Sequence, residues 1–135
     1  MDIVYTVSRV RKVFASLLCA TAVASPTLAQ TFDLQRSFAD CAGRYSALEH
    51  HLWLTDGAAA GRAAMQREAF ADLLTAVLPG DPDAASSALN QRIAARAAQA
   101  ALLRTAAFGQ NDAARSAKTL ASQYIASCDR LLLGG

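Results

Sequence analysis

Residues 34–53, LQRSFADCAGRYSALEHHLW, decide the fold. Apolar residues and one cysteine recur through this stretch at alternating steps of four and three: Leu34, Phe38, Cys41, Tyr45, Leu48 and Leu52. This spacing is typical of a helix that presents one apolar face to neighbouring helices. Asp33 or Thr31 can cap its start, and Thr55-Asp56-Gly57 is expected to end it. Cys41 lies on the apolar face and is therefore expected to point into a core.

Three further helical segments follow, separated by turn signals. The start of the second helix is not defined by the sequence, because Gly61 disfavours a helix; the helix is expected to be regular from Arg62 and to stop at Pro79-Gly80. Asp81-Pro82-Asp83 supplies a cap, a first-turn proline and an acidic residue for the third, which Gly109 ends. Asn111 is expected to cap the fourth. The predicted inward positions of the three helices are, in order, Ala63, Phe70, Leu73, Leu74 and Val77; Leu89, Ile93, Ala97, Ala100, Leu103 and Ala107; and Ala114, Ala117, Ala121, Tyr124, Cys128 and Leu131.

No segment shows the alternation of a β-strand, so the sequence predicts an all-α protein. Four helices with short connections predict an antiparallel up-down-up-down four-helix bundle over residues 30–135. Alanine dominates the middle of the third helix, and small side chains let a neighbouring helix approach closely. We therefore expect the third helix to be central and well covered.

Residues 1–29 have the pattern of a cleavable signal peptide. A basic segment precedes an apolar run of about twelve residues, which is shorter than the roughly 20 that span a bilayer. Thr27 and Ala29 are small enough for a peptidase site before Gln30. Cleavage would leave the domain in the periplasm, or secreted, without a stable membrane anchor; an uncleaved anchor is the alternative.

Cleavage would remove Cys19 and leave Cys41 and Cys128, an even number in an oxidising compartment. In the predicted bundle the start of the first helix lies beside the end of the last. Cys41 would be about 12 Å from the first of these ends and Cys128 about 7–8 Å from the second, so they fall within a turn of each other. A disulfide that joins helices one and four is therefore predicted; two buried free thiols are the alternative.

The predicted mature domain has no net charge. The whole chain has thirteen basic and eleven acidic residues, but three of the basic and one of the acidic residues lie in residues 1–29. A neutral domain lacks the basic surface that binds nucleic acids and anionic lipids. The sequence therefore argues against both kinds of partner.

Glu49-His50-His51 is the only cluster that resembles a chemical site. Adjacent helical residues point about 100° apart, so the two histidines do not readily ligate one ion together, and the chain has no third histidine. We predict that both histidines lie at the surface and that no metal or cofactor is bound; a transition-metal role for His51 is the alternative. Trp53 is expected either to cover the end of the bundle or to serve as a binding platform, because tryptophan is favoured at interfaces.

No catalytic residue is predicted. The serines and histidines occur without a nucleophile elbow or a cysteine–histidine signature, and no glycine-rich phosphate loop is present. Arg96 and Arg104 flank the alanine-rich face and are expected to be solvated; beside a cavity they would be candidates for holding an anion. Tyr45 and Tyr124 need hydrogen-bond partners where they are buried, and Arg44, Arg96 or a backbone carbonyl would serve.

The segment Cys41-Ala42-Gly43-Arg44-Tyr45-Ser46-Ala47, with a Glu-His pair and Trp53 downstream and a second cysteine near the C-terminus, resembles a group of small, exported, uncharacterised bacterial helical proteins. The resemblance spans most of the predicted mature chain. It implies a shared two-cysteine bundle. Because it carries no known activity, it transfers no functional residue.

These features favour a non-catalytic binding or interaction module whose partner is another envelope protein, contacted through Trp53, His50 and His51. One alternative is a bundle that binds a small ligand, haem or a metal, with His51 and Met65 as ligands. Another is an envelope stress chaperone, since small disulfide-closed helical proteins fill that role. An enzyme is least favoured, because the pattern does not predict a pocket with two converging titratable side chains.

Overall fold

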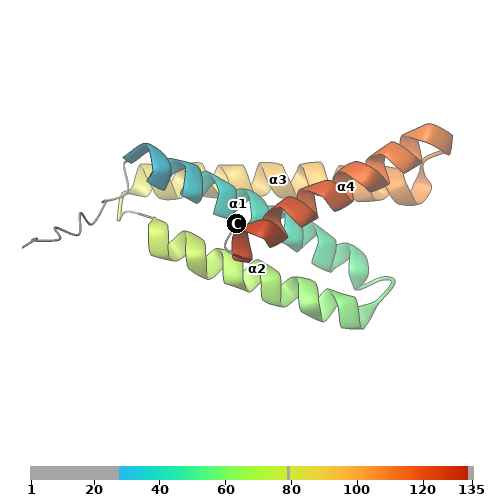
Figure 1. Cartoon of the computed structure of the whole chain (residues 1–135), viewed down its shortest axis with the longest axis horizontal. Helices are drawn as coiled ribbons and strands as arrows, with labels where there is room; N and C mark the ends of the chain where they lie inside the picture. Colours follow the sequence, from blue (N-terminus) through green and yellow to red (C-terminus); the bar gives the residue numbers. More distant parts are fainter. Residues whose placement is uncertain (1–27, 79, 134–135) are drawn as a thin grey trace, which may run out of the picture.

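The computed structural model describes residues 28–78 and 80–133, so nearly all of the predicted leader lies outside the described residues. Four α-helices and no strand occur in this part of the chain, which confirms the all-helical prediction (Figure 1). The helices are α1 (Leu28–Leu52), α2 (Gly57–Val77), α3 (Pro82–Phe108) and α4 (Asn111–Leu132).

Two of the predicted helix starts are wrong. Helix α1 begins at Leu28, so the expected caps Thr31 and Asp33 both lie inside it, and the predicted cleavage point before Gln30 falls in its first turn. Helix α4 is preceded by Gln110, which makes no side-chain cap bond. Asn111, the expected cap, is instead the first helical residue and has a φ of 54°, a left-handed conformation that asparagine adopts more readily than most residues.

The starts of α2 and α3 have the side-chain caps that such turns require. The carboxylate of Asp56 accepts a hydrogen bond from the backbone N–H of Ala59 at 3.0 Å, which satisfies one of the free donors at the start of α2. Asp81 accepts in the same way from the N–H of Asp83 at 3.2 Å, and Pro82 occupies the first turn of α3 as predicted.

Helix α1, rather than α3, is the central helix. It packs along both α2 and α3 and meets α4 over a short stretch, while α4 packs mainly on α3 (Figure 1). Within the described residues no Cα atom of α2 lies within 8 Å of a Cα atom of α3 or α4, so these helices meet α2 only through side chains. The backbones of α1 and α3 approach closely at Gly43, where an added Cβ would collide with the carbonyl oxygen of Arg92 and lie 3.1 Å from the Cβ of Ala95. A small residue in α1 thus allows the contact that places α1 at the centre.

Phe70 of α2 is the largest fully buried side chain and lies in the middle of the core. Its ring centroid is 6.2 Å from that of Phe38 and 5.9 Å from that of Tyr45, both on α1. Aromatic pairs at such distances are favourable beyond the area that they bury. Leu74, Cys128 and small residues of α1 complete the cluster, so α1 and α2 supply most of the large side chains of the core.

Cys41 and Cys128 form the predicted disulfide between α1 and α4, with a Cα–Cα distance of 5.6 Å. Both residues are buried. The crosslink joins the two helices in the short region where they meet.

Only some of the residues that were predicted to face the core are buried. Cys41, Phe38 and Tyr45 of α1 are buried as predicted, and so are Phe70 of α2 and Cys128 of α4. Several other predicted core residues are exposed: Leu34, Leu73, Leu89, Ile93, Ala97, Ala107, Tyr124 and Leu131. In α3 the buried residues are instead Ala88, Ala95 and Gln99. Ala95 lies at the close approach to Gly43, where a larger side chain would not fit, and Gln99 is buried by its hydrogen bonds with Arg44 of α1 and Ala121 of α4.

None of the described helices combines the length and the apolar character needed to cross a membrane.

Candidate functional site

The turn between α1 and α2 exposes two large apolar side chains next to each other. Trp53 is 63% exposed and Leu54 is 83% exposed. The turn is held by backbone hydrogen bonds from Trp53 N to the carbonyl oxygen of Glu49 at 3.0 Å and from Asp56 N to that of Leu52 at 2.7 Å. Trp53 and Leu54 therefore project from an ordered turn, and we call this pair the apolar tip.

The two predicted histidines lie in the last turn of α1, just before the apolar tip. His50 is exposed and His51 is half-buried. His50 and Trp53 are three residues apart, a spacing that places two side chains on the same side of a helix, whereas His51 points about 100° away from His50. His50 is therefore the histidine that accompanies Trp53 at the surface.

Glu49 forms an ion pair next to the apolar tip. Its Oε2 lies 2.7 Å from the Nε of Arg67 on α2, and both side chains are partly buried. The pair connects the last turns of α1 to α2 and supports the geometry of the turn.

The residues considered as metal ligands do not come together. Met65 is 62% exposed and lies two positions after the buried Ala63, about 200° around the helix, so its side chain points away from the side of α2 that packs on α1. In the part of the chain that the structure describes, no three histidine, cysteine, aspartate or glutamate side chains are grouped so as to hold a metal ion.

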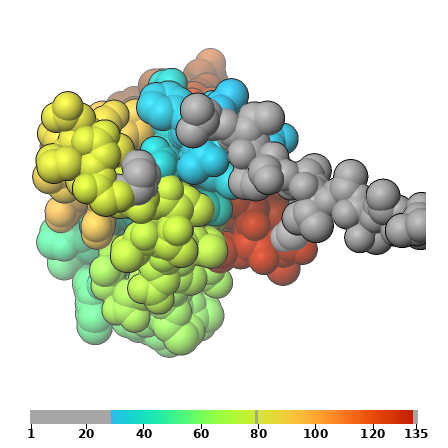
Figure 2. Space-filling view, turned by 90° about the vertical axis from the view of Figure 1, so that its left-hand side faces the viewer, coloured from blue at the N-terminus to red at the C-terminus, as the bar shows by residue number. Residues whose placement is uncertain are grey.

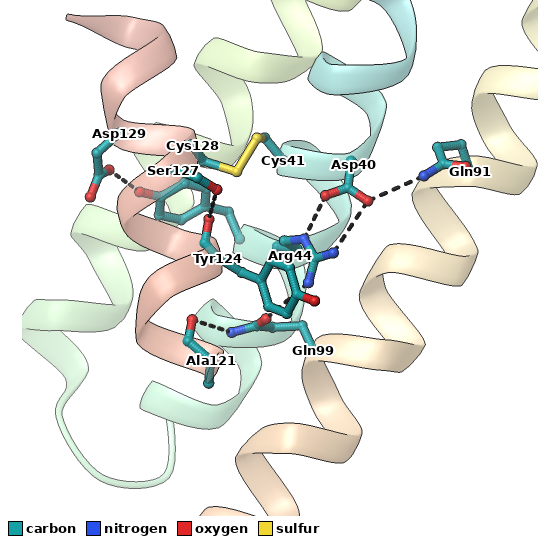
Figure 3. Close-up of a disulfide and its surroundings, with 11 residues drawn as sticks. Asp40, Cys41, Arg44, Gln91, Gln99, Ala121, Tyr124, Ser127, Cys128 and Asp129 are labelled. Carbon is teal, nitrogen blue, oxygen red and sulfur yellow. Dashed lines mark hydrogen bonds and ion pairs between the residues drawn. A yellow bond between two sulfur atoms is a disulfide. The ribbon is translucent and has the colours of Figure 1, made fainter. Parts of the chain in front are cut away.

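A polar network beside the disulfide joins α1, α3 and α4 (Figure 3). Arg44 of α1 lies at its centre, with its Nε 2.5 Å from Asp40 Oδ2 and its Nη1 donating to Gln99 Oε1 at 3.3 Å. Gln99 is fully buried in α3 and donates to the carbonyl oxygen of Ala121 in α4 at 3.2 Å. Gln91 of α3 also donates to Asp40, at 3.2 Å. The Arg44–Asp40 pair lies within α1, but the other three bonds cross between helices, so the network fixes how the three helices pack.

Tyr124 contacts Arg44, one of the expected partners, but through its ring, whereas Tyr45 has a partner that was not expected. The guanidinium carbon of Arg44 lies 3.8 Å from the centre of the Tyr124 ring, a cation–π contact that covers one face of a half-exposed ring. The hydroxyl of Tyr45 donates to the carboxylate of Asp129 on α4 (Figure 3). Burial, the hydrogen bond to Asp129 and the charge of that carboxylate, in this order, raise the pKa of Tyr45. Both tyrosines thus hold α4 on α1.

The sequence analysis missed Gln99 and Asp129. Gln99 lies in an alanine-rich helix where nothing in the local pattern marks it as buried, and Asp129 stands between Cys128 and Arg130, where an acidic residue is typical of an exposed helix surface. Arg96 and Arg104, the suggested anion ligands, are exposed and line neither of the two hollows described below.

A hollow of about 740 Å³ lies where the start of α1, the end of α2 and the start of α3 meet, at the end of the molecule that faces the viewer in Figure 2. Phe32, Val77, Leu78, Ala84 and Ala88 provide its apolar walls. The described residues that line it include Arg36 and two aspartates but no histidine, cysteine or lysine. An apolar group fits such a site better than a reacting polar group does.

A smaller hollow of about 390 Å³ lies over the disulfide and includes Arg36 and Asp40 among its lining residues. Asp40 already pairs with Arg44, so its charge is compensated within the protein.

Comparison with known proteins adds no relative: no family model, no curated protein and no solved structure matches the chain.

Proposed function

We propose that the protein is a non-catalytic helical module that binds another protein of the cell envelope through its apolar tip. The observation that carries this proposal is the exposure of Trp53 and Leu54, side by side on an ordered turn. Tryptophan is among the residues that dominate binding energy at interfaces, and a rigid turn keeps the entropy cost of binding low. The backbone that carries these two apolar side chains is already ordered before a partner binds.

Two features support a location outside the cytoplasm. The signal-peptide pattern of residues 1–29 supports export, and the Cys41–Cys128 disulfide is compatible with an oxidising compartment such as the periplasm. We place the protein in the periplasm, or outside the cell, on these two grounds together.

We also propose the up-down-up-down order for the four helices. A turn of four residues joins α1 to α2, and Gly109 and Gln110 alone separate α3 from α4. Helices that are connected so closely and pack along each other run in opposite directions. This supports antiparallel α1–α2 and α3–α4 pairs, with the disulfide joining one pair to the other.

The experiment that tests the binding function compares residues of equal exposure. A photo-crosslinking amino acid is placed at Trp53 in one variant and at Met65 in the other, because the two side chains are 63% and 62% exposed. We expect one discrete envelope-protein adduct, seen in intact cells and identified by mass spectrometry, from position 53 and none from position 65. Equal crosslinking from both positions, or none from position 53, would argue against the apolar tip.

Substitutions then measure the energy of the contact. Once the crosslinked partner is purified, Leu54→Ser should weaken its binding by about tenfold or more, as for residues that dominate an interface. Leu133→Ser is the matched control, because Leu54 and Leu133 are 83% and 85% exposed and Leu133 lies at the other end of the described chain. Equal effects of the two substitutions would indicate non-specific apolar binding.

A second function, binding of a small apolar ligand, is favoured by the hollow at the start of α1. Its volume of about 740 Å³ lies within the range of ligand sites. Native mass spectrometry of the protein purified from the periplasm would show a reproducible adduct that Ala88→Trp, which fills the hollow, removes. A bare mass would leave the interaction function as the proposal.

A further inference from the structure

The turn between α3 and α4 also exposes a large aromatic side chain. Phe108 is the last residue of α3 and is 85% exposed, and only Gly109 and Gln110 follow it before α4 begins. The backbone N–H of Gly109 donates to the carbonyl oxygen of Thr105 at 2.8 Å. Phe108 therefore projects from an ordered turn, as the apolar tip does.

The two turns lie at the same end of the molecule (Figure 1). Gln91 of α3 donates to Asp40 of α1, and further along both helices Arg44 of α1 donates to Gln99 of α3. Both helices therefore run towards this end. The apolar tip begins nine residues after Arg44, and Phe108 comes nine residues after Gln99. Because the rise per residue is the same in all α-helices, the apolar tip and Phe108 lie at about the same level along the molecule.

The predicted mature domain is neutral as a whole, but its charges are unevenly distributed. Seven charged residues lie within eight residues of the two turns, which are residues 53–56 and 109–110. They are Glu49, Asp56, Arg62, Arg104, Asp112, Arg115 and Lys118. Each of the acidic ones has a partner within the protein, since Asp56 caps α2 and the other two pair with Arg67 and Arg115.

Three cations remain unpaired around the two turns. The side chains of Arg62, Arg104 and Lys118 are exposed and form no ion pair with any described residue. Arg104 lies about one helical turn before Phe108, and Lys118 lies about two turns into α4. Surface charge of one sign attracts a partner of the opposite sign and speeds its approach. The partner that this end attracts is therefore acidic.

We propose that the apolar tip and Phe108 together bind one partner protein, at a surface where apolar pockets lie among acidic side chains. This second contact rests on the proposed function and adds the charge of the partner to it. Apolar residues at the centre of a contact and charged residues at its rim are the usual arrangement of a protein interface. Three unpaired cations are fewer than the clusters of about four to eight that bind anionic lipids, which favours a protein over a membrane.

Photo-crosslinking at position 108 tests the second contact. Benzoylphenylalanine replaces Phe108 in one variant and Leu133 in the other, because both side chains are 85% exposed. We expect position 108 to capture the same envelope protein as position 53, and position 133 to capture none. The attachment sites in the partner, mapped by mass spectrometry, should lie next to aspartate or glutamate residues.

Charge reversal tests the acidic surroundings of the partner's pockets. With the captured partner purified, Arg104→Glu and Lys118→Glu should each weaken binding by about three- to tenfold at low salt, mainly through slower association, and high salt should shrink this loss. Arg96→Glu is the matched control, since Arg96 is an exposed arginine of the same helix that lies about 12 Å further from the turn than Arg104. Circular dichroism should show the same helix content in all these proteins.

Three results would overturn the proposal. One is capture from position 53 without capture of the same protein from position 108, and another is an affinity that neither charge reversal nor salt changes. The third is binding to phosphatidylglycerol vesicles that Phe108→Ser abolishes, with no protein captured from position 108, which would assign this end to a lipid surface. In the first two cases the proposed function stands, whereas no capture from position 53 would contradict the proposed function as well.

Discussion

Removal of the disulfide is expected to lower the free energy of unfolding by about 4–5 kcal/mol. The two cysteines are 87 residues apart, and a crosslink that closes a loop of this length removes about 15 cal/mol/K of entropy from the unfolded chain, or about 4.6 kcal/mol at 25 °C. Domains of this size are stable by about 5–15 kcal/mol in total, so the loss is a large share. Few other contacts would hold α4 on α1 once the disulfide is removed, because the two helices meet only over a short stretch.

Thermal unfolding followed by circular dichroism measures this loss in Cys41→Ser, Cys128→Ser and the double variant. A loss of 1 kcal/mol lowers the midpoint of a domain near 100 residues by about 4–8 °C, so we expect a midpoint about 20 °C lower or more. The double variant should melt close to the single variants, because each substitution alone already opens the crosslink. Single-variant midpoints within a few degrees of the wild-type value would refute the reasoning.

Hydrogen exchange locates the loss within the structure. After reduction, the amides of α4 should lose protection first, since α4 is then held mainly by α3, by Gln99 and by the Tyr45–Asp129 hydrogen bond. The amides of α2 should keep theirs, because the backbone of α2 packs along α1 and does not come close to that of α4. Equal loss in α2 and α4 would mean that the helices depend on each other in a way that the observed packing does not explain.

Three further predictions concern single side chains. Gly43→Ala should destabilise the protein by about 1–3 kcal/mol in urea unfolding, because its Cβ has no room against α3, whereas Gly61→Ala, which meets nothing within 4 Å, should stabilise it by about 0.5–1 kcal/mol. Gln99→Leu should cost about 1–3 kcal/mol, because it leaves a buried carbonyl and the Arg44 guanidinium without this partner; a neutral result would show that the network does not contribute to stability. Because the pKa of Tyr45 is raised on folding, its contribution is complete below about pH 10 and is lost as the pH rises further, so the free energy of unfolding should fall by up to about 1.4 kcal/mol per pH unit there. Tyr45→Phe should remove that alkaline decline and Tyr124→Phe should keep it; a decline of equal slope in both variants would contradict the assignment.

The features that local chemistry decides could be predicted from the sequence. The start of α3 follows from the cap Asp81 and the first-turn Pro82, and its end from Gly109, whereas the start of α2 at Gly57 lies before the expected one because Asp56 caps it. The disulfide follows from two cysteines on the apolar faces of the first and last helices. The start of α1 could not be predicted in this way, since Thr31 and Asp33 are good capping residues that tertiary structure places inside a helix.

The identity of the central helix could not be predicted, because it depends on how two helices fit rather than on either one alone. Alanine content marks α3 as the helix that others can approach closely. The close approach does occur, but it involves one side of α3 and the single Gly43 of α1, and it leaves α1 in the middle. Gln99 illustrates the same limit, because its burial is explained only by Arg44 on α1 and a carbonyl on α4. The exposure of Trp53 likewise depends on where the turn ends, which is why the sequence left both a cover and a binding platform open.

The wrong prediction for α3 shows what helical spacing alone can decide. Leu89, Ile93 and Ala97 follow helical spacing closely enough to predict a buried face, yet the fold buries the opposite side of α3, with Gln99 among its residues. The spacing identifies an apolar line along the helix. Which side packs is decided instead by the close approach of α3 to Gly43 and by the hydrogen bonds that join Gln99 to Arg44 and to the carbonyl oxygen of Ala121, and these partners lie on other helices.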